Sequence, residues 1–365
     1  MALTREEADR YQRHLSLQGF GPAAQEKLKA SSVLVIGAGG LGCPALLYLA
    51  AAGVGRIVIV DPDTVDVSNL QRQVLYTNAD KGRGKAESAA QRLLALNPLI
   101  RVEAKAIRFE RLNALELVKS CDIVVDGSDN FATRYLVNDA CVIAGRPFVY
   151  GAIHGFEGQL SVFNYKAGPT YRCLFPEPPE AGTVPNCAEA GVLGVVTGVI
   201  GTAQACEAVK ILAGVGEPLS GRLLVWNALS MTFLTVGLKA DPASRNITEL
   251  PPEGYGETCA AEFAEDDIDK VALERLLGAG TPLQVVDVRE GWEREQSSIE
   301  PSFHIPLRYL EAATTLELAP LDPAIPTVVF CAHGIRSLRG IQILRQNHGF
   351  RSAVSLRGGI HAWLS

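Results

Sequence analysis

Apolar runs without interruption alternate with longer amphipathic stretches over much of this chain. Residues 33–36 and 57–60 are apolar at every position, a pattern typical of strands buried on both faces of a parallel sheet. The stretch between them, residues 43–54, has the length and composition of a helix. This order predicts a βαβ unit and, with it, a doubly wound, Rossmann-like α/β sheet.

Further segments of the same kind extend this pattern. Residues 85–96, rich in Ala and Leu, are expected to form a helix, and residues 192–212 a buried apolar helix. Additional strands are predicted in NPLIRVEAKAI, DIVVDGSDN, GRPFVYGAI, GQLSVFNY and GRLLVWNAL. Together they predict one large sheet covered by helices.

The composition changes near residue 240. A polar segment rich in Pro, Gly and acidic residues follows, and it reads as a linker. A shorter alternation of helices and strands then begins, as expected for a small α/β domain. We therefore predict an amino-terminal domain over 1–245, a linker over 246–266 and a carboxy-terminal domain over 267–365.

Length and charge narrow the class of protein. The 365 residues are too many for one typical core and fit two domains. A net charge of −6 and the lack of basic runs argue against nucleic acid as a partner. The sequence shows neither a signal peptide nor a membrane-spanning run, and its eight cysteines form no CxxC pair. We expect a cytoplasmic protein with reduced thiols, not associated with a membrane.

The turn after the first strand, VLVIGAGGLG, is typical of nucleotide binding. Its glycines, Gly37, Gly39, Gly40 and Gly42, let the backbone approach phosphates at a helix N-terminus. Asp61, at the end of the next strand, lies where a carboxylate binds ribose hydroxyls. Taken alone, this fingerprint fits an NAD-dependent oxidoreductase.

The residues that follow favour a triphosphate over a nicotinamide. Arg72 and Lys85 bring positive charge that a hydride-transfer site does not need, but that phosphates and a leaving pyrophosphate do. Asn69 and Gln73 lie beside Arg72 in sequence, and Asp63 is also assigned to the nucleotide site.

A second polar turn, GSDNFATR, follows another apolar strand. Carboxyl ends of parallel strands meet at one edge of the sheet, so Asp129 is placed to hold Mg²⁺, with Asn130 beside it at the nucleotide. Each of these charges could singly be a solvated surface residue. Their joint order is what indicates a Mg-ATP site.

That order resembles the ubiquitin-activating-enzyme-like adenylyltransferases of sulfur-carrier activation, the molybdopterin-synthase and thiamine-biosynthesis activators. The resemblance covers residues 10–238 and is carried by RYQRH, GAGGLG, DPDTVDVSNLQRQ, GKAES, LNP, DNFATRYLVNDAC, GFEGQ, YRCLFPEPP and CAEAGVLG. It implies a homodimer that uses Mg-ATP to adenylate the C-terminal Gly-Gly of a ubiquitin-like sulfur carrier. It also implies that Arg13 reaches the γ-phosphate across the dimer.

The chain departs from this family at its zinc site, which usually consists of two CxxC pairs. Thr170 and Cys173 stand at the first pair, and Ser244 and Ile247 at the second. One thiolate does not build a four-coordinate zinc site, so we predict no zinc and a packed Cys173.

Two other cysteines are candidates for chemistry. Cys187 follows a segment rich in Pro, Glu and Gly, and the resemblance places it on a crossover loop that links to the carrier tail. Cys331 lies in CAHGIRS between a strand and a helix, where backbone N–H groups, the helix N-terminus and Arg336 favour a thiolate or persulfide. Arg336 also offers a fork for an anionic sulfur donor.

The residues around Cys331 resemble a rhodanese domain over 267–365, through VVDVREGWE, HIPL, CAHGIRS and LRGGIHAW. In that resemblance Asp287 and Arg289 serve the fold rather than the chemistry. The two resemblances together imply a bifunctional adenylyltransferase and sulfurtransferase.

In this interpretation, a Cys331 persulfide converts the carrier adenylate to a thiocarboxylate, Cys187 helps release through an acyl disulfide, and thiosulfate or a cysteine desulfurase donates the sulfur. A non-catalytic carrier-binding scaffold and an NAD-dependent oxidoreductase remain alternatives. The sequence leaves open whether molybdopterin, thiamine, thiolated tRNA, cysteine or a secondary metabolite receives the sulfur.

Overall fold

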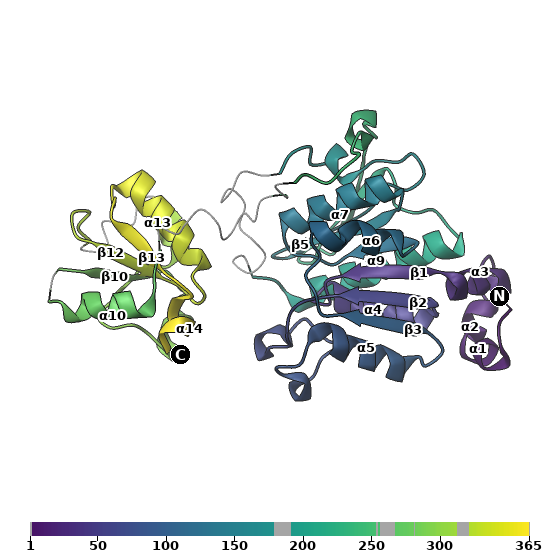
Figure 1. The fold of residues 1–365 in the computed structure, drawn as a ribbon, viewed down its shortest axis with the longest axis horizontal. Coiled ribbons are helices and arrows are strands. Elements are labelled where there is room, and N and C mark those ends of the chain that lie inside the picture. The colour runs from purple at the N-terminus through teal and green to yellow at the C-terminus, as the bar shows by residue number, and fades with distance from the viewer. Residues whose placement is uncertain are drawn as a thin grey trace. The chain divides into compact units, whose positions relative to one another are not determined.

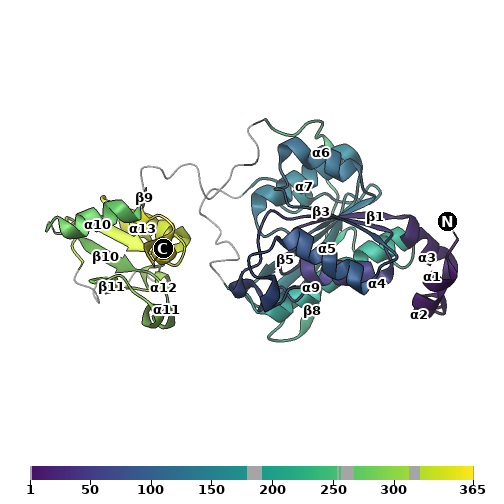
Figure 2. The same ribbon diagram turned by 60° about the horizontal axis from the view of Figure 1, so that its bottom comes forward.

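The computed structural model describes residues 2–178, 191–252, 255, 267–280, 282–311 and 321–364. They form two compact units, a larger one with the described residues up to 255 and a smaller one with those from 267 onward (Figures 1 and 2). The predicted linker over 246–266 lies partly outside the described residues, and the domain boundaries stay a prediction.

An eight-stranded sheet in the order β3-β2-β1-β4-β5-β6-β7-β8 forms the centre of the larger unit. The first five of these strands in space are parallel, and the last three join them antiparallel. The strands are β1 (Ser32–Ile36), β2 (Arg56–Val60), β3 (Arg101–Lys105), β4 (Ile123–Asp126), β5 (Phe148–His154), β6 (Glu157–Phe163), β7 (Arg222–Asn227) and β8 (Thr232–Gly237).

Helices cover both faces of this sheet (Figure 1). One face packs against α3 (Gly21–Ala30), α4 (Gly42–Ala52), α5 (Lys85–Leu96) and α9 (Gly194–Ala213), and the other against α6 (Arg111–Lys119) and α7 (Phe131–Ala144). Within β1, Val33 and Val35 face the first layer, and Leu34 and Ile36 the second. The unbroken apolar runs follow from this double coverage, and the predicted doubly wound fold is confirmed.

Short helices complete the larger unit. They are α1 (Arg5–Arg10), α2 (Gln12–Leu15) and the 3-10 turns η1 (Val67–Asn69), η2 (Asn78–Asp80), η3 (Tyr171–Cys173) and η4 (Pro242–Arg245). Among the described residues, α9 is the one helix long and apolar enough to cross a membrane, but it packs against α4, β5 and β6 within the fold. Its composition is accounted for by this packing.

The sequence analysis missed β8, the edge strand of the large sheet. All six of its residues are exposed, so no buried face imposes an alternating pattern. Large apolar side chains, among them Phe233 and Leu234, are exposed along it.

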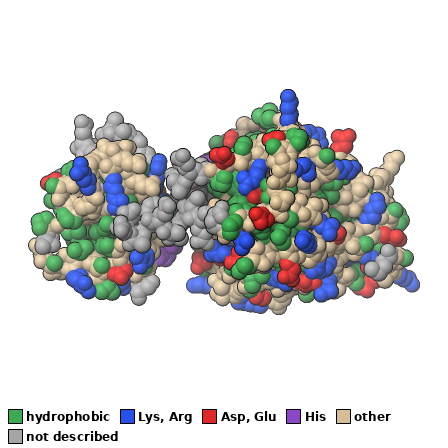
Figure 3. All heavy atoms as spheres, turned by 45° about the horizontal axis from the view of Figure 1, so that its top comes forward, with side chains coloured by type: hydrophobic (Ala, Val, Ile, Leu, Met, Phe, Trp, Pro, Cys, Tyr) green, Lys and Arg blue, Asp and Glu red, His purple; other side chains and the backbone are tan. Residues whose placement is uncertain are grey.

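On the face of the larger unit in Figure 3, basic and acidic side chains are interspersed around hydrophobic ones.

The smaller unit has a five-stranded parallel sheet in the order β11-β10-β12-β13-β9. Its elements are β9 (Asp267–Ile268), α10 (Lys270–Gly278), β10 (Gln284–Asp287), α11 (Gly291–Gln296), β11 (Phe303–His304), α12 (Leu307–Glu311), β12 (Thr327–Phe330), α13 (Ile335–His348), β13 (Ala353–Leu356) and α14 (Gly359–Leu364). Separate apolar clusters fill its two faces, one against α13 and one against α10 and α14. This confirms the predicted second α/β fold.

Candidate functional site

The turns after β1 and β4 meet where the order of the large sheet changes direction, the usual place for a ligand in a doubly wound fold. Gly37 has a positive φ of 86°, and a Cβ there would lie 2.8 Å from the carbonyl oxygen of Gly127. A Cβ at Gly42 would lie 1.9 Å from the carbonyl oxygen of Gly37. Glycine is therefore required for the turn to fold back against its neighbour.

The carboxylate of Asp61 accepts two backbone hydrogen bonds, one of them from the glycine turn. Its Oδ2 accepts the N–H of Ala38 at 2.7 Å, and its Oδ1 accepts the N–H of Asp63 at 2.9 Å. The carboxyl group is buried, and burial raises its pKa despite these bonds. In this structure Asp61 orders the backbone around the turn, and its contact with ribose stays a prediction.

Lys85 lies at the start of α5, next to the glycine turn. Its Nζ is 2.8 Å from Oδ2 of Asp63, and Tyr76 donates its hydroxyl to the carbonyl oxygens of both Ala38 and Lys85. The Lys85 side chain is largely buried, whereas that of Asp63 is mostly exposed. An exposed carboxylate is a weak partner, so a phosphate can compete for the ammonium group.

Asn69 is the last residue of η1, and Arg72 and Gln73 follow it in sequence. Arg72 donates from Nη1 to the carbonyl of Ser68 at 3.2 Å, and Asn69 completes the cap of η1. Gln73 is buried, lies beside Gly39, and has an Oε1 with no hydrogen-bond partner among the described residues. A buried acceptor of this kind is available to a bound donor.

The turn after β4 carries the predicted metal ligand. Asp129 is exposed, and Asn130 caps α7 by accepting the N–H of Thr133 at 2.8 Å. The sequence analysis missed Asp126, the last residue of β4, which is buried with its Oδ2 unpartnered among the described residues. Burial raises the pKa of Asp126. The sequence signal that could have identified Asp126 is a carboxylate at the end of an apolar strand.

Gly40, Arg13 and Cys187 are the remaining residues predicted for the function. Gly40 lies against Thr197 of α9, and its lack of a side chain lets that helix pack close to the turn. Arg13 is exposed on α2. Cys187 lies outside the described residues.

Thr170, Cys173 and Ser244 meet at the corner where the family would hold zinc. Ser244 Oγ lies 2.8 Å from Oγ1 of Thr170 and 3.1 Å from Sγ of Cys173, which also accepts the N–H of Asp241 at 3.3 Å. Ile247 is half-buried nearby in sequence. The described residues contain no group of three or more His, Cys, Asp or Glu that could hold a metal.

Hydrogen bonds set the ionisation of this thiol. Burial alone would raise the pKa of Cys173, but bonds from the Asp241 N–H, Ser244 and Thr170 hold it below its ordinary value. The corner is thus closed by polar contacts around one sulfur.

In the smaller unit, Cys331 follows β12 directly and begins a tight loop into α13. Its Sγ accepts the N–H of Gly334 at 3.1 Å and lies 3.5 Å from the hydroxyl of Ser337. Gly334 has a φ of 94°, which lets the loop turn back under the sulfur. More than one backbone N–H group was expected around the sulfur. Among the described residues, the N–H of Gly334 is the one hydrogen-bonded to it.

Segments that the sequence analysis did not assign to the sulfur site hold this loop in place. The N–H groups of Ile360 and His361 in α14 donate to the carbonyls of Cys331 and Ala332 at 2.8 and 3.2 Å. A Cβ at Gly359 would lie 2.3 Å from the Cys331 carbonyl oxygen. Backbone hydrogen bonds from α14 therefore support the loop.

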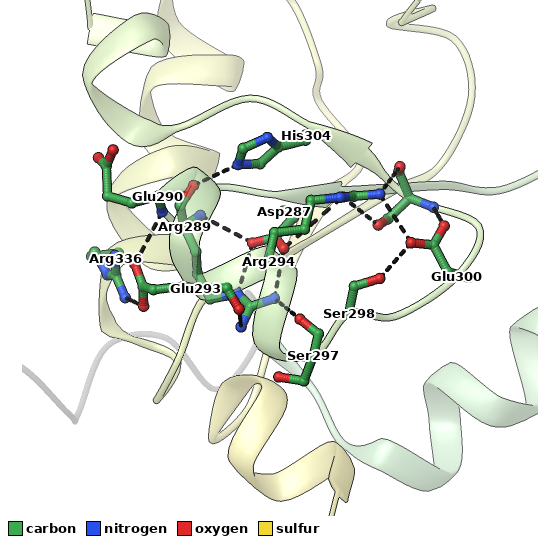
Figure 4. A network of polar contacts seen from close by, with 11 residues as sticks. Asp287, Arg289, Glu290, Glu293, Arg294, Ser297, Ser298, Glu300, His304 and Arg336 are labelled. Carbon is green, nitrogen blue, oxygen red and sulfur yellow. Dashed lines mark hydrogen bonds and ion pairs between the residues drawn. The ribbon is translucent and has the colours of Figure 1, made fainter.

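Arg336, predicted to bind an anionic donor, is paired with a carboxylate of the protein instead (Figure 4). Its Nη1 and Nη2 donate to the two oxygens of Glu293 at 2.7 and 2.6 Å. Asp287 and Arg289 form a fully buried pair, with Arg289 Nη2 2.7 Å from Oδ2. The structural role expected of Asp287 and Arg289 agrees with this burial.

Residues 11–246 match the ThiF family, and residues 269–365 match the Rhodanese-like domain. The chain is 47% identical to "Probable adenylyltransferase/sulfurtransferase MoeZ" of Mycobacterium tuberculosis, across 99% of this chain and 94% of that one. It is 42% identical to "Adenylyltransferase and sulfurtransferase MOCS3" of Sus scrofa, across 99% and 86%.

Two further comparisons concern the larger unit. A "Sulfur carrier protein adenylyltransferase" of Thermus thermophilus is 55% identical over 66% of this chain and 91% of its own length. The crystal structure of E. coli MccB with MccA-N7isoASN shares the fold, with a TM-score of 0.59 and 24% identity over 66% of this chain and 74% of that one. The chain therefore belongs to the ThiF family and carries a rhodanese-like domain after its ThiF domain.

Proposed function

We propose that this chain is a bifunctional enzyme. With Mg-ATP it adenylates the C-terminal Gly-Gly carboxylate of a ubiquitin-like sulfur carrier, and with a Cys331 persulfide it converts the adenylate to a thiocarboxylate. The observation that carries this proposal is one chain that contains both a glycine turn followed by Arg72 and Lys85 and a Cys331 loop. Full-length relatives are named for both activities.

The adenylation site fits a nucleoside triphosphate better than a dinucleotide. Arg72 and Lys85 neutralise phosphate charge, and the glycine turn admits the phosphates to the N-terminus of α4. Asp129 is an exposed carboxylate and fits Mg²⁺, which takes one or two carboxylates together with substrate phosphates. When bound, Mg²⁺ would neutralise the charge that develops on the pyrophosphate.

The chemistry of the first half-reaction needs no nucleophile from the enzyme. An oxygen of the carrier carboxylate bonds to the α-phosphorus, and pyrophosphate leaves with the electrons of the broken P–O bond. The protein contributes alignment and positive charge. We propose that Asn69, Gln73 and Asn130 help to orient the nucleotide, and that Arg13 acts across a homodimer.

In the second half-reaction, the outer sulfur of the Cys331 persulfide attacks the acyl carbon and AMP leaves. The product is an acyl disulfide on Cys331. Attack by a second thiolate on Sγ of Cys331 releases the carrier thiocarboxylate and leaves a disulfide, which a cellular dithiol reduces. We propose that Cys187 assists this release through a transient acyl disulfide of its own: its thiolate bonds to the outer sulfur, the Cys331 thiolate leaves, and a cellular thiol then attacks Sγ of Cys187 to free the thiocarboxylate.

A protein substrate requires an exposed docking surface. The apolar side chains along β8 are a candidate for the surface that the carrier covers. We further propose that the enzyme acts in the cytoplasm, where its thiols stay reduced.

Intact mass spectrometry of Gly-Gly carriers tests the whole proposal. Each carrier is incubated with the enzyme, Mg-ATP, and either thiosulfate or a cysteine desulfurase with cysteine. We expect a gain in mass equal to the replacement of one oxygen by sulfur. Carrier-dependent exchange between ATP and pyrophosphate separates the half-reactions, since Arg72→Ala and Asp129→Ala should abolish it and Cys331→Ala should not. Exchange retained in Arg72→Ala would contradict the site, and no carrier modification of any kind would favour a non-catalytic scaffold.

A further inference from the structure

The side chain that faces Arg336 beside the sulfur loop is Glu293 of α11 (Figure 4). Both terminal nitrogens of the guanidinium donate to Glu293, at 2.7 and 2.6 Å, in a bidentate pair. The side chains of Arg336 and Glu293 are only 21% and 12% exposed, so water does little to screen the pair.

Glu293 is fixed in this position by the fold. Its Oε2 accepts the N–H of Glu290 at 3.0 Å, which closes the capping box of α11. Its carbonyl accepts Nη1 of Arg289 at 3.2 Å, and Arg289 is in turn held by the buried Asp287. The carboxylate is therefore presented to Arg336 by a rigid support rather than by a flexible surface chain.

The pair also fixes the charge next to the sulfur. Burial would raise the pKa of Glu293, but the bonds from Arg336 and Glu290 hold it below its ordinary value, so Glu293 is ionised at neutral pH. An ionised Glu293 cancels the charge of Arg336 and repels a second anion. The nearby Glu290 pairs with Arg308 at 3.2 Å, which leaves no net positive charge from that pair either.

We propose that Glu293 determines the sulfur donor: by occupying Arg336 it disfavours a small free dianion such as thiosulfate and leaves the Cys331 loop to a persulfide carried on a protein. This inference rests on the sulfur transfer proposed above and names the donor class of that site.

The two donors load Cys331 by balanced steps. With thiosulfate, the Cys331 thiolate bonds to the outer sulfur, the S–S bond breaks, and sulfite leaves with its electron pair. With a protein persulfide, the thiolate bonds to the outer sulfur and the donor cysteine leaves as a thiolate. Only the first route brings a dianion to the loop and gains from a free guanidinium.

The test compares full-length variants loaded from thiosulfate and from a cysteine desulfurase with cysteine. With cyanide as the acceptor of the outer sulfur, sulfite release gives KM and kcat for thiosulfate, and mass spectrometry without cyanide measures the Cys331 persulfide. We expect Glu293→Gln to lower the KM for thiosulfate about tenfold, the effect of about 1.4 kcal/mol, with little change in kcat or in loading from the desulfurase. The matched control is Glu295→Gln, which removes the same charge from an exposed position of α11.

A double variant tests whether the gain acts through Arg336. Adding Arg336→Met to Glu293→Gln should return the KM to the wild-type value or above. An unchanged KM in Glu293→Gln, an equal fall in Glu295→Gln, or loss of loading from both donors would each overturn the inference. Wild-type enzyme that gains no persulfide from either donor would instead overturn the proposed sulfur transfer itself.

Discussion

Replacing Ser244 by Ala removes the central hydroxyl of the corner around Cys173. Ser244 Oγ lies 2.7 Å from the carbonyl oxygen of Asp241, 2.8 Å from Oγ1 of Thr170 and 3.1 Å from Sγ of Cys173. A hydrogen bond contributes a net of about 0.5–1.5 kcal/mol, so the loss of two to three bonds in this half-buried corner should lower the free energy of unfolding by about 1–4.5 kcal/mol. Because the corner joins residues 170–173 to residues 241–244, we expect the larger unit to carry this loss.

Urea unfolding followed by tryptophan fluorescence measures the effect. Trp226 is buried in the larger unit, so the assay uses a background in which Trp292 and Trp363 of the smaller unit are replaced by Phe. Ser16→Ala is the matched control, because that exposed hydroxyl makes a hydrogen bond only to the Gln12 carbonyl within the described residues.

The same assay with a chelator tests the predicted absence of zinc. We expect the unfolding midpoint of the wild-type chain to be unchanged by the chelator. Stoichiometric zinc that stabilises the purified protein, or a Ser244→Ala stability equal to that of Ser16→Ala, would refute the reasoning.

Three further predictions concern the Cys173 corner, the nucleotide turn and the Cys331 loop. The wild-type chain should gain stability over Cys173→Ser as the pH rises toward about 9, the ordinary thiol pKa. The reason is that the pKa of Cys173 is lower in the folded state than in the unfolded state, which favours the folded thiolate. Unfolding at several pH values measures the difference in stability, and a difference that does not change with pH contradicts the prediction. Lys85→Met should reduce ATP–pyrophosphate exchange by about 10²–10³-fold, whereas the exposed Lys81→Met should not. Gly359→Ala should slow persulfide loading and destabilise the smaller unit by about 1–3 kcal/mol, whereas Gly278→Ala, with open space around it, should do neither.

Local patterns were enough to predict most of the fold. The apolar strands, the glycine turn after β1 and the α5 helix over Lys85–Leu96 are each specified by neighbouring residues, and the structure agrees with them. The exposed β8 was missed because burial, which produces the recognisable pattern, does not act on it.

Contacts between distant residues were beyond such patterns. Glu293 and Arg336 are 43 positions apart, and a single sequence gives no sign that they meet. The close approach of Gly37 to Gly127 likewise depends on β1 pairing with β4. The sequence therefore indicated the residue types at each site, whereas the partners of Asp61 and Arg336 required coordinates.

The support of the sulfur loop by α14 has a consequence for synthesis on the ribosome. The carbonyls of Cys331 and Ala332 gain their partners only when residues 359–361 have left the exit tunnel. Domains fold largely in the order of translation, so the nucleotide turn of a nascent chain can form long before its thiol loop does. A chain that stalls before α14 would thus carry a complete nucleotide turn and an unfinished loop around the reactive cysteine.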